Sequence, residues 1–224
     1  MNEMMNRSNL KVLGTSSSLG GYFLEIKVTG ECKFAGDVDC QSLSLTGETA
    51  VSGSLRMEKL KMTGELSVKK RMEGGMLRGH GEVQAGSVSA RQLKFSGSLE
   101  VGGDCEAEEL QVSGALRIKG LLSAETLQLT LYGPSSAAEV GGSTITVKRS
   151  KTKTLLHLGQ GQDMVFTSGL IEGDYVELQN TYAGTVRGEK IIIGPGCVIQ
   201  LVEYRDYLEI HKSATVLEQR KYVK

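Results

Sequence analysis

The sequence is poor in the residues that anchor most globular cores. Its 224 residues include no tryptophan and two prolines, and aromatic residues make up only 5% of the chain. A domain of this size usually buries more aromatic area, because aromatic side chains supply large contact surfaces. Glycine, in contrast, occurs 29 times. This composition argues against an aromatic-rich core and predicts a narrow one, filled by rows of aliphatic side chains.

The sequence also has no excess of charge of either sign. Lys and Arg together number 26, as do Asp and Glu, so the formal net charge is zero. Nucleic-acid-binding domains usually carry a basic patch or stripe and a high isoelectric point. No P-loop signature occurs either. We therefore expect neither nucleic acid nor a nucleotide among the partners.

Signatures of catalysis and metal binding are missing. The sequence contains no His-Glu-x-x-His, Gly-x-Ser-x-Gly or Cys-x-x-Cys motif. Its three histidines, His80, His157 and His211, are scattered without a partner pattern. We expect a protein that is not an enzyme, with no catalytic residue, no metal site and no cofactor.

Long apolar runs and paired cysteines are absent as well. No run of 18 apolar residues occurs, and no segment resembles a secretion signal. Three of the four cysteines, Cys32, Cys40, Cys105 and Cys197, fall where a small apolar residue is expected. We interpret all four as buried free thiols, and we expect a cytoplasmic protein.

What the sequence does contain is a short repeat. Residues 93–120 hold one alternating pattern twice, at a 17-residue interval: Leu93-x-Phe95-x-Gly97-x-Leu99-x-Val101 and Leu110-x-Val112-x-Gly114-x-Leu116-x-Ile118. Alternation of apolar and polar residues is the period of a half-buried β-strand. A fixed short repeat indicates a solenoid.

The same pattern extends over much of the chain. Its first leucine recurs at Leu43, Leu60, Leu77, Leu93, Leu110 and Leu127, in steps of 17, 17, 16, 17 and 17. A glycine recurs at Gly30, Gly47, Gly64, Gly81, Gly97 and Gly114. None of the inward positions of the alternation between residues 38 and 129 is Asp, Glu, Lys or Arg. This is expected of buried positions, because an unpaired buried charge is costly.

We therefore predict an all-β protein, a parallel β-helix in which each 17-residue copy forms one turn, or rung, of three short strands. Each strand pairs with its equivalent one turn away, about 4.8 Å along the axis. Glycines occupy the corners because they tolerate positive φ. The third copy, residues 70–86, has extra glycines at Gly74, Gly75 and Gly79. We interpret it as a distorted rung, with a hinge or a lateral contact as the alternative.

The pattern divides the chain into five parts. Whether its two repeat segments form one stack or pack side by side is left open. Within the second segment, strands are expected at 155–158 and 164–166. The parts are a flexible lead-in with one strand-like unit (1–20), a main β-helix of about six rungs (21–133), a linker or corner (134–143), a second β-helical segment (144–217) and a charged tail (218–224).

With the repeat laid out, the chain resembles the bactofilin family of polymer-forming cytoskeletal proteins. The second half, with IEGDYVELQNT, GEKIIIGPGC and LVEYRDYLEIH, is similar to that of longer, two-part members found in Bacillus-type bacteria. In the first half, the resemblance is carried by Leu10-x-Val12-x-Gly14, Ser16 to Ser18, Gly20-Gly21, Ile26-x-Val28-x-Gly30 and the 17-residue rungs.

This resemblance implies a right-handed, three-sided parallel β-helix that assembles end to end into filaments without nucleotide. It also implies a scaffolding role in envelope-associated processes such as cell shape or motility. The implied partners are further copies of the chain itself and a paralogous family member.

The fold itself indicates where such assembly would occur. A β-helix has two open ends with unpaired strand edges, which are templates for pairing with another chain. A head-to-tail contact that does not close produces an open filament. From their terminal positions in the repeat, we predict that the polymer interface comprises the first rung, with Leu10, Val12, Ile26 and Val28, and the last rung, with Tyr207, Leu208, Ile210 and Val216.

Three other interpretations remain open. A monomeric solenoid would act as an adaptor that holds a protein partner on its flank. The run Ile193-Gly-Pro-Gly-Cys197-Val resembles hexapeptide-repeat acyltransferases, although the glycine and leucine intervals here do not keep a steady six-residue step. The basic cluster Lys148-Arg149-Ser-Lys151-x-Lys153 either protects an exposed sheet edge or contacts anionic lipid at a membrane surface.

Overall fold

The computed structural model describes residues 7–150 and 164–222. All regular elements in these two ranges are β-strands. Lys151, Lys153, His157 and the strand expected at 155–158 lie outside the described residues. The strands are β1 (Ser8–Ser18), β2 (Gly21–Phe34), β3 (Val38–Val51), β4 (Leu55–Val101), β5 (Cys105–Leu131), β6 (Ser135–Arg149), β7 (Phe166–Leu178), β8 (Thr181–Ile193), β9 (Val198–Ile210) and β10 (Thr215–Lys221).

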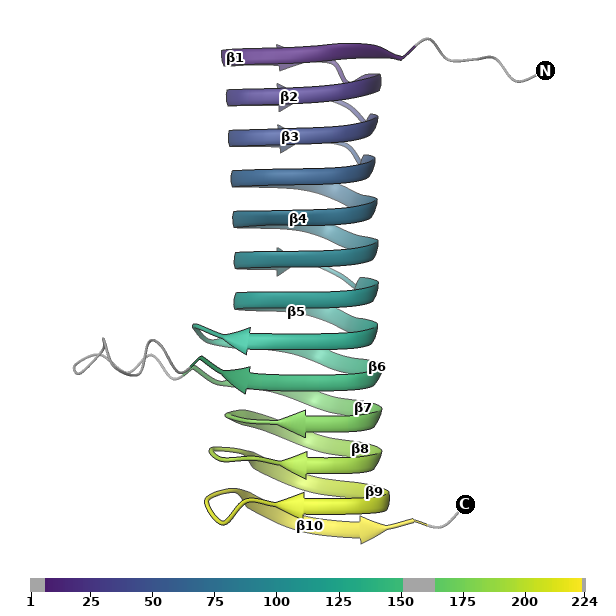
Figure 1. Ribbon diagram of the computed structural model, residues 1–224, viewed down its shortest axis with the longest axis vertical. Coiled ribbons are helices and arrows are strands. Elements are labelled where there is room, and N and C mark those ends of the chain that lie inside the picture. The colour runs from purple at the N-terminus through teal and green to yellow at the C-terminus, as the bar shows by residue number, and fades with distance from the viewer. Residues whose placement is uncertain (1–6, 151–163, 223–224) are drawn as a thin grey trace, which may run out of the picture.

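The strands form one parallel sheet that follows chain order from β1 to β10. The sheet coils into a single column of about 12 turns, with the two ends of the chain at opposite ends of the column (Figure 1). The predicted all-β parallel solenoid is therefore confirmed. β4 and β5 are long because they continue through the corners without interruption.

The 17-residue period is the register of the sheet in the first half. Val38 pairs with Gly21 on one side and with Leu55 on the other, which is a step of 17 in each direction. Equivalent side chains therefore stack, as Ile26, Leu43 and Leu60 do. Parallel strands need a crossover between neighbours, and here the remainder of each rung provides it.

Burial follows the predicted alternation closely. The inward positions between residues 38 and 129 are buried, except for Gly74, Gly79, Ala90 and Ala107, which are partly exposed. All four cysteines are buried and free, as predicted. Burial of this kind removes apolar surface from water all along the column, and this is the main favourable contribution to its stability.

Gly47 shows why the corners require glycine. Its φ is +119°, and a Cβ built on it would lie closer to the carbonyl oxygen of Gly30 in the preceding rung than any real Cβ contact. The same relationship links Gly64 to Gly47 and continues along the corner as far as Gly114. The glycines that recur in the sequence therefore stack in one column, the glycine ladder, in which the backbone of each glycine contacts that of the glycine one rung earlier.

The glycine-rich third copy is regular, because β4 runs through it unbroken. Gly79 leaves room for side chains from both neighbouring rungs, since a Cβ there would meet Met62 and Phe95. Gly75 lies beneath an ion pair between Arg91 and Glu58, which are two rungs apart. The extra glycines thus accommodate larger side chains of adjacent rungs, and the expected distortion is not observed.

Of the two alternatives expected for residues 134–143, the corner is found, at the turn around Pro134, and the linker is not, because residues 135–143 belong to β6. Only the turn around Pro134 interrupts the sheet, and β6 pairs with β5 on one side and with β7 on the other. The step between stacked positions changes there, because Leu127 pairs with Ile145, and a bulge lies between Ile118 and Leu121. Because the period changes, the sequence repeat is lost although the stack continues.

The second repeat segment continues the first stack, so the two segments form one column and do not pack side by side. Phe166, expected at the end of a strand, begins β7 and pairs with Thr181, a step of 15, while Ile191 pairs with Leu208, a step of 17. Residues 8–18, expected within a flexible lead-in, form β1, and β10 extends into the expected tail as far as Lys221.

Candidate assembly surfaces at the two ends of the solenoid

The N-terminal end of the column is formed by β1. In the described part of the chain, β1 has a sheet partner on one side only, namely β2. Among the described residues, the backbone N–H and C=O groups on its other edge have no strand to pair with. An unpaired strand edge is a ready template for another strand.

Two apolar rows of the core reach this end. Leu10 stacks on Ile26 and Val12 stacks on Val28. Leu10 is partly buried and Val12 is 5% exposed, whereas Ile26 and Val28 are 0% and 1% exposed. Ile26 and Val28 were placed in the first rung by the sequence analysis, but they lie in the second rung and are covered by β1. Leu10 and Val12 are the members of this group at the end surface.

The neighbouring side of the first rung is polar. Ser16 and Ser18 continue the rows of Cys32 and Phe34, and they place hydroxyl groups where deeper rungs have apolar side chains. Solenoids commonly have polar terminal repeats, which keep the end soluble. The apolar part of the N-terminal end is therefore restricted to the side that carries Leu10 and Val12.

Arg7 fixes the start of the first rung to the column. Its Nη1 donates to the carbonyl oxygen of Phe23 at 3.1 Å and pairs with Oδ1 of Asp39 at 2.7 Å. Its guanidinium also lies over the ring of Tyr22, 5.9 Å from the centroid. Local sequence patterns gave no indication of this anchor, because Asp39 is two rungs further along the chain.

The C-terminal end is a step. β10 covers β9 from Val198 to Tyr204, so in the part of the chain that the structure describes Tyr207 and Ile210 are bonded to β8 with no further rung over them. Their exposed fractions are 48% and 37%. Leu208, between them, packs against the core and is partly buried.

Two further side chains define the last rung. Val216 stacks on Ile199 and is partly buried, so it continues a core row to the end surface. Gln219 stacks on Val202, where deeper rungs have apolar residues, and it is exposed. As at the N-terminal end, one part of the terminal rung is apolar and another part is polar.

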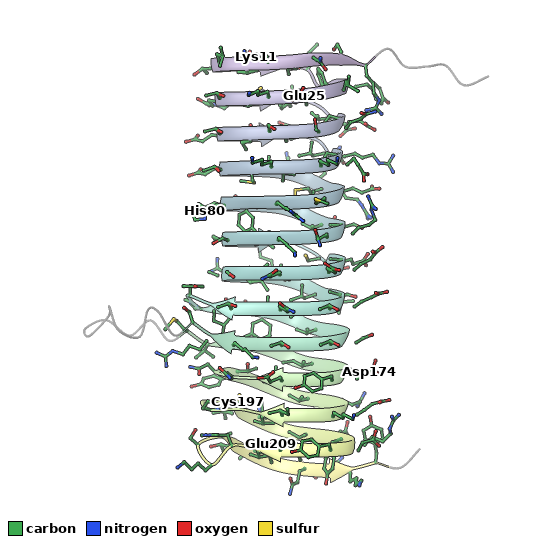
Figure 2. The ribbon with its side chains drawn as sticks, viewed as in Figure 1. Lys11, Glu25, His80, Asp174, Cys197 and Glu209 are labelled. Carbon is green, nitrogen blue, oxygen red and sulfur yellow. The ribbon has the colours of Figure 1, made fainter. Side chains whose placement is uncertain are left out.

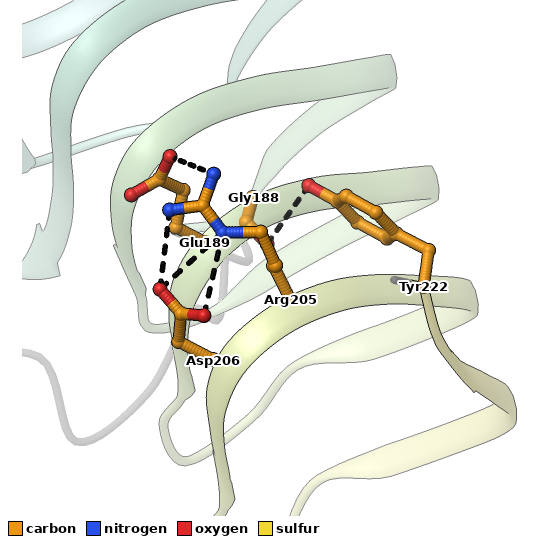
Figure 3. Close-up of polar contacts among 5 residues, drawn as sticks. All are labelled: Gly188, Glu189, Arg205, Asp206 and Tyr222. Atoms are coloured by element: carbon orange, nitrogen blue, oxygen red, sulfur yellow. Dashed lines mark hydrogen bonds and ion pairs between the residues drawn. The ribbon is translucent and has the colours of Figure 1, made fainter. Parts of the chain in front are cut away.

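A polar cluster holds the last rungs together (Figure 3). Arg205 pairs with Glu189 of the preceding rung and, at 3.2 Å, with its neighbour Asp206. These contacts raise the pKa of Arg205 and lower that of Asp206, chiefly through their mutual hydrogen bonds. Tyr222 donates its hydroxyl to the carbonyl oxygen of Gly188 at 3.4 Å. The end of the chain is therefore tied to β8.

Figure 2 shows the two ends in one view, with Lys11 on the first rung and Glu209 at the C-terminal end. Glu209 accepts a hydrogen bond from the hydroxyl of Tyr207 at 2.8 Å, and this contact raises the pKa of Tyr207. The structure thus brings six of the eight predicted interface residues to end surfaces, in two groups: Leu10 and Val12, and Tyr207, Leu208, Ile210 and Val216.

The remaining candidates from the sequence lie elsewhere. Lys148 pairs with Glu177 at 3.2 Å on the flank of the column, and Arg149 is exposed at the end of β6. His80 and His211 are exposed in different halves, and Nδ1 of His211 lies 2.8 Å from Oγ of Ser213. No group of three or more possible metal ligands occurs among the described residues.

Over residues 7–150 and 164–222, no helix has the length and apolar character needed to cross a bilayer.

The chain is similar to two proteins of Bacillus subtilis (strain 168). It is 47% identical over 85 residues to "Uncharacterized protein YhbE", and 40% identical over 87 residues to "Uncharacterized protein YhbF". These matches cover 38% and 39% of this chain and 35% of each relative, so the chain matches about a third of their length. No protein-family model matches it, and no solved structure matches it significantly.

Proposed function

We propose that the protein is a structural scaffold that assembles end to end, without nucleotide, into bactofilin-like cytoskeletal polymers that serve envelope-associated processes such as cell shape or motility. The observation that carries this proposal is that, in the described part of the chain, neither end of the continuous parallel solenoid is covered by another element. Each end combines an unpaired strand edge with apolar side chains of the core rows.

End-to-end contact would pair the strand edges and bury the apolar side chains of the ends at the same time. Pairing a second copy on β1 or on the step formed by β9 and β10 supplies hydrogen-bond partners for an edge that otherwise faces water. It also buries Leu10 at one end and Ile210 at the other, which are more exposed than the same rows inside the column. Burial of apolar area drives most protein association.

The direct test is electron microscopy and sedimentation of the purified full chain without nucleotide, with and without liposomes. Filaments are the expected result. Two arginine substitutions at the ends, Leu10→Arg and Val216→Arg, are each expected to shorten or abolish them, because each buries a charge in the contact. Filaments seen only on liposomes would place assembly at a membrane surface.

Each end offers a matched control on the same strand. Leu13 on β1 is 70% exposed and Leu217 on β10 is 74% exposed, and neither continues a core row. Leu13→Arg and Leu217→Arg are therefore expected to leave filaments intact. A folded protein that stays monomeric at micromolar concentration would overturn the proposal and favour an adaptor that binds a protein partner on its flank.

A further inference from the structure

Two columns of like charge run along the first half of the solenoid. Equivalent residues in successive rungs stack, as Lys11 does on Lys27 and Glu31 on Glu48. The two columns flank the same glycine corner, the one that contains Gly30 and Gly47. The basic column consists of Lys11, Lys27, Lys61, Arg78 and Lys94, with Ser44 interrupting it between Lys27 and Lys61, and the acidic column consists of Glu31, Glu48, Glu65 and Glu82.

The charges of these columns are almost unpaired within the molecule. Among the described residues, Glu48, Glu65 and Glu82 make no ion pair, and Glu31 pairs only with Lys33, at 2.8 Å. None of the basic column's residues makes an ion pair in this part of the chain, and Arg78 has only a hydrogen bond to Gln92, at 2.9 Å.

Stacking like charges in this way is unfavourable. Neighbouring strands lie about 4.8 Å apart, and like charges directly opposite each other on a sheet destabilise it. All four glutamates line one shallow groove together with Thr49, Ser67 and a single cation, Lys33. The isolated chain therefore contains repulsion on two faces that a partner of opposite charge would relieve.

The other faces of the column are arranged differently. On the preceding side of the same rungs, Arg56 pairs with Glu73 at 3.0 Å in the next rung. In the second half, Arg187 lies between Glu172 and Glu203, at 3.3 and 2.7 Å. Charges alternate from rung to rung there and neutralise one another. Single-sign columns are thus a property of the two faces beside the glycine corner.

We propose that this corner is a lateral docking surface for a second copy of the chain, with the two solenoids parallel and the basic column of each against the acidic column of the other. The two columns share rungs, so Lys27, Lys61 and Arg78 can each face the glutamate in the same rung of the partner, whereas Ser44 brings no charge to Glu48. Between the two columns lie an exposed row that includes Thr29, Thr46, Thr63 and His80 and, at the corner itself, the glycines. The glycines have no side chains, so the two backbones can approach closely along the corner.

Symmetry selects the parallel arrangement. Both columns flank one corner, so a two-fold axis parallel to the solenoid places each basic column against the partner's acidic column. A two-fold axis perpendicular to the solenoid places like columns together. The favourable contact is therefore isologous, and it uses the flank of the column. It does not depend on end-to-end assembly, since single chains and filaments present the same flank.

Exposed ion pairs are individually weak and are screened by salt. Lateral pairing is therefore expected to need the whole set of charges and to weaken at least about tenfold between roughly 0.01 M and 0.5 M salt. Sedimentation velocity of the full chain measures this dependence for single particles. Electron microscopy measures it as the fraction of paired filaments.

Charge reversal provides the decisive experiment. An acid-reversed variant and a base-reversed variant should each lose lateral pairing at low salt, and mixing them should restore it, because the two reversed surfaces complement each other. The acid-reversed variant carries Glu48→Lys, Glu65→Lys and Glu82→Lys, and the base-reversed variant carries Lys27→Glu, Lys61→Glu and Lys94→Glu.

A matched control has the same change of net charge on another face. Glu106, Glu108 and Glu125 are exposed and make no ion pair among the described residues, so their triple substitution by lysine is expected to leave pairing intact. Circular dichroism checks that all variants fold. Absence of pairing at low salt, equal loss in the control, or no recovery on mixing would overturn the proposal. If the chain forms lateral pairs at low salt but no long filaments, end-to-end assembly is contradicted and lateral pairing is not.

Discussion

The ring of Phe95 packs over Gly79 so closely that a Cβ built on the glycine would lie 3.2 Å from Cε2 of the ring. Met62, in the rung on the other side, approaches the same position more closely still. Gly79 is therefore an inward position whose missing side chain is replaced by side chains of its two neighbours.

We expect Gly79→Val to destabilise the protein by about 1–3 kcal/mol, because it overpacks a filled part of the core. Urea unfolding measures the change. Combining it with Phe95→Leu should recover part of the loss, so the two effects should not add. Gly141 is a suitable control, since no atom lies within 4 Å of the position that a Cβ would occupy there, and Gly141→Ala should change stability little.

The glycine ladder predicts a second kind of sensitivity. Gly47→Ala places a Cβ against the carbonyl oxygen of Gly30 at a φ of +119°, so we expect a loss of about 2 kcal/mol. Gly102, whose nearest contact would be 3.7 Å and whose φ is outside the left-handed region, is the matched control. Equal unfolding free energies for the two alanine variants would contradict the ladder.

Arg7 should control the stability of the first rung. We expect Arg7→Gln to lower the unfolding free energy by about 0.5–1 kcal/mol, because Arg7 and Asp39 are both partly buried. The larger effect should be faster hydrogen exchange in β1, which has one sheet partner in the described chain. Arg117→Gln, which breaks a longer and more exposed pair with Glu100, should leave exchange in β1 unchanged.

The buried thiols predict loss of stability at high pH. Burial raises the pKa of Cys40 and of Cys105 to about 12 and that of Cys197 to about 11, with smaller contributions from Asp39 and Glu106 for the first two. Unfolded thiols ionise near their ordinary value of 9.0, so the unfolded state releases protons first. The contribution of the protonated thiols to the free energy of unfolding is therefore complete below about pH 9 and decreases as the pH rises toward 11–12.

Urea midpoints at pH 8 and pH 10.5 test this dependence. The midpoint should fall at the higher pH, and Cys105→Ala should reduce the difference between the two midpoints even though it lowers both. An unchanged difference would show that Cys105 does not contribute. In the native protein at pH 8, the four thiols should react with a thiol reagent only after unfolding.

The sequence by itself determined the period, the inward positions and the corner glycines of the first half. Alternation and a steady 17-residue step are visible along the chain, and burial of Leu43, Leu60 and Leu110 follows from them. At the ends of the column, the sequence correctly predicted which residues of the first and last strands lie at the end surfaces, but it misplaced Ile26 and Val28 by one rung. It did not show that β1 covers them, because coverage depends on where the chain before Gly20 pairs with the sheet.

Only the tertiary structure decided how the stack continues beyond residue 133 and which charges remain unpaired. The step between stacked positions changes from 17 to 18, is 31 between β6 and β7, and is then 15, so no fixed period survives in the sequence. Ion pairs such as Arg91 with Glu58 join residues that are far apart along the chain. Glu73 is paired because the preceding rung places Arg56 beside it, whereas the preceding rung places Glu48 beside Glu65. The physical reason is that every contact along a solenoid's axis is made between rungs, and the register of the rungs decides which residues meet.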